Sequence, residues 1–114
     1  MSEEVAAVLE QAADLIETKG HCKGVYFSPT GEHCLVGALA EVIKLYDMCN
    51  WHDAFQFEGA LVALKTELWG NPLRADVDLM NWNDMKDRKS DQVVDLLKTT
   101  AKDLRNRSGD AGAA

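Results

Sequence analysis

Two His-Cys dipeptides are the residues of this chain best suited to do chemistry. His21-Cys22 and His33-Cys34 lie twelve residues apart, with turn-forming residues 28–31 between them. Two imidazoles and two thiols are the ligands of a tetrahedral zinc site, and a hairpin would bring all four together. Neighbouring residues on a strand point to opposite faces, so Cys22, Cys34, one histidine and a carboxylate make an easier set. We expect no cofactor, with zinc at His21, Cys22, His33 and Cys34 as the alternative.

A thiol nucleophile is a second use of the same residues. Cys34 falls where the predicted hairpin meets the next helix, and a helix N-terminus lowers the pKa of a thiol. His21 or His52 can act as the base, with Asn83 or Asp84 orienting the imidazole. The apolar residues that follow Cys34 indicate instead that its thiol is buried. A thiol-dependent hydrolase using Cys34 and a histidine is therefore an alternative function.

Aromatic and polar residues in the predicted connections form a third candidate site. Tryptophans in loops, with Asn and Asp nearby, line pockets and form the centres of protein interfaces. The competing interpretation is that the tryptophans close the ends of the core. Asn81 and Asn83 flank Trp82, and buried asparagines need partners, so these two are expected to cap helix ends. The predicted contact surface consists of Trp51, His52, Phe55, Trp82, Asn83 and Asp84.

Apolar residues at helical spacing indicate that helices position these groups. The expected helices cover residues 3–18, 34–47, 53–69 and 90–105, and residues 79–84 form either one helical turn or a packed loop. Strand-forming residues 24–27 and the turn after them predict a short β-hairpin. The fold class is therefore mainly α, a small bundle of about four helices with a short β-hairpin insertion after the first helix. One helical domain is expected over residues 1–107, followed by a disordered tail at 108–114.

The composition excludes several classes of protein. The chain has 114 residues and a formal net charge of -7, which is unsuited to direct contact with nucleic-acid phosphates. No segment reaches the ~20 apolar residues of a membrane-spanning helix, and the acidic N-terminus is unlike a signal peptide. Three cysteines without an export signal point to reduced thiols in the cytoplasm. The expected helix 34–47 is apolar nearly all round, which short helices cover poorly, so a homodimer is expected.

Several segments of the chain together resemble a known family. In order, they are residues 12–17, Gly20-x-Cys22-x-Gly24, Cys34-Leu35-x-Gly37-Ala38-Leu39, Trp82-Asn83-Asp84, and residues 87–90 before a Val-Val-x-Leu-Leu helix. This pattern resembles a family of small uncharacterised proteins from actinobacteria and their phages, catalogued as a domain of unknown function. The resemblance implies no catalytic residues and marks Cys22, Cys34 and Asn83-Asp84 as pattern positions. Related sequences carry a tryptophan where His21 and His33 stand here, which argues against a four-ligand metal site shared by the family.

The function expected from these patterns is binding without catalysis. The phage-like resemblance implies an accessory factor that engages a host protein or sequesters a small ligand. A protein partner, a homodimer and a small-molecule ligand all agree with this expectation, whereas direct nucleic-acid and membrane contacts do not. The rival function is a thiol-dependent or zinc-stabilised module centred on Cys22 and Cys34.

Overall fold

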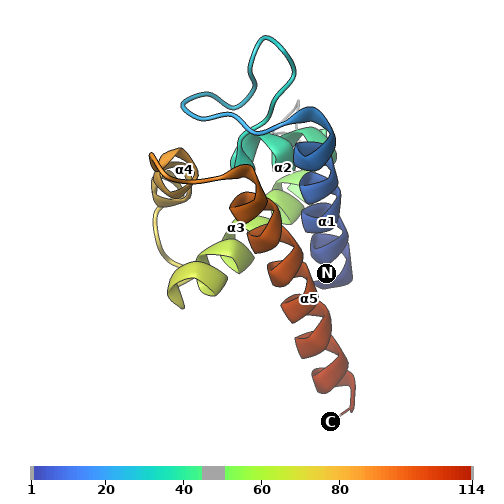
Figure 1. The fold of residues 1–114 in the computed structure, drawn as a ribbon. Coiled ribbons are helices and arrows are strands. Elements are labelled where there is room, and N and C mark those ends of the chain that lie inside the picture. The colour runs from blue at the N-terminus through green and yellow to red at the C-terminus, as the bar shows by residue number, and fades with distance from the viewer. Residues whose placement is uncertain (1, 45–50, 114) are drawn as a thin grey trace.

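A computed structural model describes residues 2–44 and 51–113 (Figure 1). Its helices are α1 (Ser2–Lys19), α2 (Leu35–Ile43), α3 (Trp51–Trp69), α4 (Asp76–Asp84) and α5 (Ser90–Ala113). The mainly helical class is confirmed. The described residues form five helices and no β-strand, so the predicted β-hairpin insertion is wrong. None of the described helices is long and apolar enough to cross a membrane.

Helices α1 and α5 lie side by side in opposite directions (Figure 1). Arg105 Nη2, late in the chain, lies 2.9 Å from Glu3 Oε1 in the first turn of α1. Lys98 Nζ, earlier in α5, lies 2.7 Å from Glu17 Oε1 near the end of α1. Exposed ion pairs of this kind contribute less than about 1 kcal/mol each. The buried apolar seam between the two helices therefore supplies most of the stabilisation.

Helix α2 is the most buried helix of the fold, as its apolar composition predicts. It begins after Cys34, whose Sγ accepts a hydrogen bond from the backbone N–H of Gly37 at 3.2 Å. It ends at Ile43, because Lys44 adopts a left-handed backbone conformation with φ 59°. The sequence predicted a helix over residues 34–47, whereas α2 ends at Ile43. Residues 45–47 lie outside the described part of the chain.

Residues 20–34, between α1 and α2, form an irregular loop that we call loop 20–34. Its β-type pairings are isolated bridges that join His33 to His21 and to Phe27. Three glycines in the loop have a left-handed backbone, which bends an extended chain and prevents a continuous ladder. This is the physical reason why strand-forming residues do not build a hairpin here. The glycines are Gly20 (φ 100°), Gly24 (φ 80°) and Gly31 (φ 96°).

Loop 20–34 rests directly on the backbone of α2. A Cβ atom placed on Gly37 would lie 2.2 Å from the carbonyl oxygen of Tyr26. The same oxygen accepts a hydrogen bond from the backbone N–H of Cys34 at 3.0 Å. The absence of a side chain at Gly37 therefore allows the loop to approach α2 closely enough to be held by backbone contact.

Helix α4 lies in the segment whose structure the sequence left open between a helical turn and a loop. Over its nine residues only Leu79 and Asn83 are buried, which explains the weak apolar pattern. Its start is tied to α3, because the Nζ of buried Lys65 donates to Asp76 Oδ1. A buried ammonium group is costly without a partner, so this ion pair helps to fix the position where α4 begins.

Removing Asp76 and removing Lys65 are expected to change the free energy of unfolding by different amounts, because only Lys65 is buried. Asp76→Ala leaves the buried ammonium of Lys65 unpaired and is expected to lower the free energy of unfolding by about 1–2 kcal/mol. Lys65→Met removes the buried charge at similar volume and is expected to change it by less than about 1 kcal/mol. Urea denaturation measures both. Asp78→Ala, which breaks the more exposed pair with Arg74, is the matched control. Equal losses for Asp76→Ala and Asp78→Ala would contradict this role.

Glu67 of α3 faces α5, where it meets both Asp103 and Arg107. Burial, followed by the hydrogen bond and charge of Asp103, raises the pKa of Glu67 above its ordinary value of 4.5, although Arg107 opposes this. A raised pKa means that the folded protein binds this proton more tightly than the unfolded chain. The contribution of Glu67 to stability is therefore fully present below pH 4.5 and decreases as the pH rises through the folded-state pKa.

Glu67→Gln is accordingly expected to raise the Tm at pH 7, because the glutamine carries no charge beside Asp103. The gain is expected to shrink as the pH approaches 4.5. Thermal unfolding followed by circular dichroism across this range measures it. Glu58→Gln, an exposed change on the same helix, is the control. A lower Tm at pH 7 would show instead that the attraction between Glu67 and Arg107 dominates.

Candidate functional site

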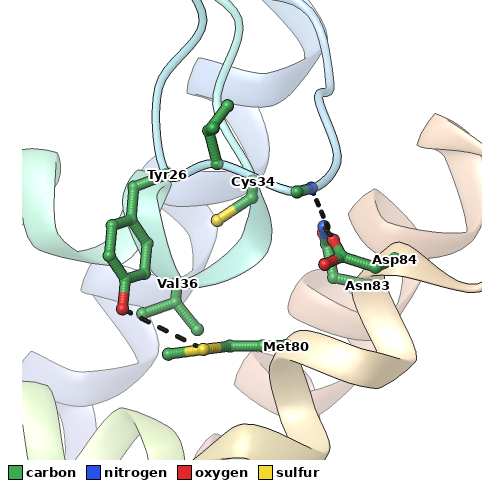
Figure 2. Close-up of a pocket in the computed structure, with 8 residues that line it drawn as sticks. Tyr26, Cys34, Val36, Met80, Asn83 and Asp84 are labelled. Carbon is green, nitrogen blue, oxygen red and sulfur yellow. Dashed lines mark hydrogen bonds between the residues drawn. The ribbon is translucent and has the colours of Figure 1, made fainter.

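A cleft opens between loop 20–34 and α4 (Figure 2). Its volume is about 370 Å³, within the range of small-molecule sites. The Tyr26 hydroxyl makes a weak contact with Met80 Sδ at 3.9 Å, so the loop and α4 meet at the cleft. The side chains of Cys34 and Val36, from the start of α2, line the space between them. The complete lining is Gly24, Val25, Tyr26, Cys34, Val36, Met80, Asn83 and Asp84.

Asn83 joins the three segments that surround the cleft. Its side chain is 1% exposed, and its Oδ1 accepts the backbone N–H of Leu35 at 3.0 Å, the first residue of α2. Its Nδ2 donates to the carbonyl oxygen of Cys22 at 3.2 Å and to Asp84 Oδ1 at 2.9 Å. The expectation that this asparagine caps a helix end is confirmed by the bond to Leu35. Asn81, its predicted companion, is exposed.

Asp84 and Lys23 complete the attachment of loop 20–34 to α4. Asp84 Oδ1 accepts the backbone N–H of Gly24 at 3.0 Å, which holds the loop at one of its three left-handed glycines. Lys23 Nζ donates to the carbonyl oxygens of Met85 at 2.7 Å and Lys86 at 3.2 Å. These carbonyls follow the end of α4, where a cation is favoured by the helix dipole. The cleft walls are therefore fixed by hydrogen bonds from both sides.

The thiols of Cys34 and Cys22 both have pKa values raised above the ordinary value, which disfavours the nucleophilic thiolate. Burial raises the pKa of the Cys34 thiol above its ordinary value, although the N–H groups of Gly37 and Val36 lower it in part. Burial and then the neighbouring Cys34 raise the pKa of Cys22 as well. The effect of the α2 N-terminus on Cys34 is thus present, but desolvation outweighs it. In the described part of the chain, no hydrogen bond joins either thiol to a histidine ring.

The two histidines of the dipeptides have separate environments. His21 Nε2 lies 2.7 Å from Asn83 Oδ1; because that oxygen is fixed as an acceptor by Leu35, His21 donates from Nε2. The His33 ring packs edge-on against Phe27, with 5.3 Å between centroids. Among residues 2–44 and 51–113, no three His, Cys, Asp or Glu side chains are arranged to hold a metal ion. A zinc site at His21, Cys22, His33 and Cys34 stays a prediction without geometric support.

The predicted contact surface is divided between opposite ends of α1. Trp51, His52 and Phe55 lie at the start of α3, where His52 Nε2 is 3.9 Å from Glu4 Oε2 in the first turn of α1. Residues 82–84 instead contact the loop that follows the last turn of α1. A helix of 18 residues is about 27 Å long. The two groups therefore do not form one site, and only Asn83 and Asp84 line the cleft.

Trp82 lies on α4 but packs away from the cleft lining. It is half-buried against the hydrophobic core. The guanidinium carbon of Arg88 lies 3.8 Å from the centroid of the Trp82 ring, and Arg88 Nε donates to the Trp82 carbonyl oxygen at 2.9 Å. This cation–π contact covers the outer face of the ring. The arrangement supports the interpretation that Trp82 closes one end of the core.

Val25, Tyr26, Val36 and Met80 are cleft residues that the sequence did not assign to a site. Tyr26 falls within residues 24–27, whose pattern favours a strand, and it is 49% exposed. An exposed aromatic next to a glycine-rich loop is a signal that could have been used. Met80 and Val36 carried no such signal, because an apolar residue on a helix indicates burial in a core equally well.

Comparison with known proteins places the chain in a family but does not supply an activity. No curated protein and no solved structure gives a significant match to the sequence. A family model described as a family of unknown function (DUF6197) matches residues 1–103. These residues include α1 to α4, the larger part of α5 and the whole cleft. The chain is therefore a member of the DUF6197 family of unknown function.

Proposed function

We propose that this protein binds a small molecule in the cleft between loop 20–34 and α4, and that it acts by binding without catalysis. The observation that carries the proposal is the cleft itself, about 370 Å³ in volume and lined mainly by apolar side chains. A lining of this kind with a few fixed polar groups is typical of ligand sites. Tyr26, Met80 and Val36 supply the apolar surface, and Asp84 supplies the polar group.

The support of the cleft walls also favours binding. The hydrogen bonds of Asn83, and those of Asp84 and Lys23, hold loop 20–34 on α4 before a ligand arrives. A site that is already formed loses little conformational entropy on binding, which favours affinity. The raised pKa of the Cys34 thiol, caused by burial, makes this residue part of the apolar lining at neutral pH. These observations favour a ligand site over a thiol-dependent reaction.

The cellular setting follows from the sequence resemblance and is part of the same proposal. We infer an accessory factor of an actinobacterial or phage type that acts in the cytoplasm, where Cys22 and Cys34 stay reduced. Sequestering a small ligand is the accessory role that the cleft fits best. A protein partner or a homodimer would add to this role without replacing the cleft.

A thermal-shift screen against small apolar compounds tests the proposed function. A compound present at about 100 times its Kd stabilises the folded protein by about 2.7 kcal/mol, which raises the Tm by several degrees. Met80→Trp fills the cleft and is expected to abolish the shift. Val77→Trp introduces a tryptophan one turn earlier on α4, at an exposed position outside the lining, and is expected to preserve the thermal shift. Equal shifts in both variants, or no stabilising compound, would contradict the proposal.

A further inference from the structure

The carboxylate of Asp84 is oriented by the protein but not neutralised by it. Its two hydrogen bonds come from the Gly24 backbone N–H at 3.0 Å and Asn83 Nδ2 at 2.9 Å, and both fall on Oδ1. Both donors are uncharged. Lys23, which crosses from the loop to α4, donates its ammonium to the carbonyl oxygens of Met85 and Lys86. In the described part of the chain, no ion pair involves Asp84, so the acidic side chain of the cleft lining has no basic partner.

Asp84 is an exposed residue at the edge of the cleft, and its charge also acts on the Cys34 side chain. Burial is the main cause that raises the pKa of the Cys34 thiol, and the charge of Asp84 adds to it. Cys34 lines the same cleft as Asp84. No lysine, arginine or histidine is among the lining residues, and the whole chain carries a net charge of -7. A cleft that carries only negative charge attracts a cationic ligand and disfavours an anionic one.

The remainder of the lining suits a flat apolar body. Tyr26 is 49% exposed and presents an aromatic ring, and the polarisable thioether of Met80 lies beside its hydroxyl (Figure 2). Thioethers and aromatic rings pack well against aromatic ligands, and a tyrosine ring also attracts a cation. Val36 and Cys34 add apolar surface at the start of α2. The lining therefore combines an apolar body site with one carboxylate at its edge.

We propose that the ligand class is a small aromatic amine, with its ring packed in the cleft against Tyr26 and Met80 and its ammonium group on the carboxylate of Asp84. This inference rests on the proposed function, because it names the chemistry of the molecule that the cleft binds. Asp84 is then a specificity-determining residue: it selects the charge of the ligand. Tyr26 and Met80 bind the body of the ligand whatever its charge.

Three probes with the same ring and different head groups test the inference by isothermal titration calorimetry. Tryptamine carries an ammonium, tryptophol a hydroxyl and indoleacetate a carboxylate. Tryptamine is expected to bind at least about tenfold more tightly than tryptophol, and indoleacetate more weakly than both. Asp84→Asn keeps an acceptor for Gly24 and is expected to remove the preference for tryptamine while preserving tryptophol binding. Asp78→Asn removes an equal charge from α4 outside the cleft and is expected to change nothing.

The results of this titration distinguish failure of the proposed ligand class from failure of the proposed cleft site. Equal affinities for the three probes, abolished by Met80→Trp, would overturn the amine and leave the site standing. A preference for indoleacetate, or no binding of tryptamine at millimolar concentration, would also overturn the amine. A preference for tryptamine that persists in Asp84→Asn would show that another group selects the charge. Binding of tryptophol by Asp84→Asn is the evidence that this variant retains a folded cleft.

Discussion

Replacing Asn83 by alanine is expected to lower the free energy of unfolding by about 3 kcal/mol. The side chain is 1% exposed and bonds to the backbone of Leu35 and Cys22. Its loss leaves a buried donor at the first residue of α2 and an acceptor in loop 20–34 without partners, and each unpaired buried group costs about 1–3 kcal/mol. The contact to His21 is lost as well. Urea denaturation of the wild type and the variant measures the difference.

Asn81→Ala is the matched control for this prediction. Asn81 lies on the same helix but is exposed, so its removal is expected to change the free energy of unfolding by less than about 0.5 kcal/mol. A second variant, Asn83→Asp, keeps the acceptor for Leu35 but loses the donor and places a second carboxylate beside Asp84. It is expected to be destabilised at pH 7 and to recover partly in acid. Equal stability of Asn83→Ala and Asn81→Ala would contradict the joining role of Asn83.

Gly37→Ala is expected to destabilise the protein by about 2 kcal/mol, against the usual effect of this change in a helix. Helix propensity alone predicts a gain of about 1 kcal/mol. The new Cβ would lie 2.2 Å from the carbonyl oxygen of Tyr26, however, so loop 20–34 must move away from α2. The movement breaks the bond from the Cys34 N–H to that oxygen and opens the cleft. Thermal and urea unfolding, with hydrogen exchange of the loop amides, measure both effects.

Gly59→Ala in α3 provides the control for this second prediction. A Cβ there would lie 3.2 Å from a methyl group of Val5, which is a side chain and can shift slightly. Gly59→Ala is therefore expected to be neutral or mildly stabilising. Stabilisation by Gly37→Ala as well would mean that loop 20–34 is not packed on α2 as described.

The sequence predicted the helical class because α1, α2 and α5 bury residues at regular helical spacing. Helix α4 was left open because it buries only Leu79 and Asn83, and an asparagine does not count as a core residue in an apolar pattern. The burial of Asn83 depends on hydrogen-bond partners in loop 20–34, such as the Cys22 carbonyl, which lies 61 residues earlier in the chain. Such a contact has no local signal, so pattern analysis could not find it.

The error at loop 20–34 has a similar origin. Residues 24–27 favour a strand, and residues 28–31 favour a turn, but pairing also requires a continuous extended backbone. The left-handed Gly24 interrupts the extended backbone. The carbonyl of Tyr26 packs against Gly37 of α2, and this contact takes the place of strand pairing. For the site, Asn83 and Asp84 were predicted from their chemistry. Met80 and Val36 were not, because only the fold distinguishes a cleft lining from a core.

Amide-detected NMR of the labelled protein with a mixture of small aromatic compounds tests the central claim most directly. Binding in the cleft predicts that resonance shifts concentrate at Gly24, Tyr26, Val36 and Met80, with the amides on the outer face of the α1–α5 pair unchanged. The same shifts are expected to disappear in Met80→Trp. A polar groove between α1 and α5 is lined by Glu10, Asp14, Lys98, Lys102, Arg105 and Asn106. Shifts centred on that groove, or the absence of any localised shift, would contradict a ligand site between loop 20–34 and α4.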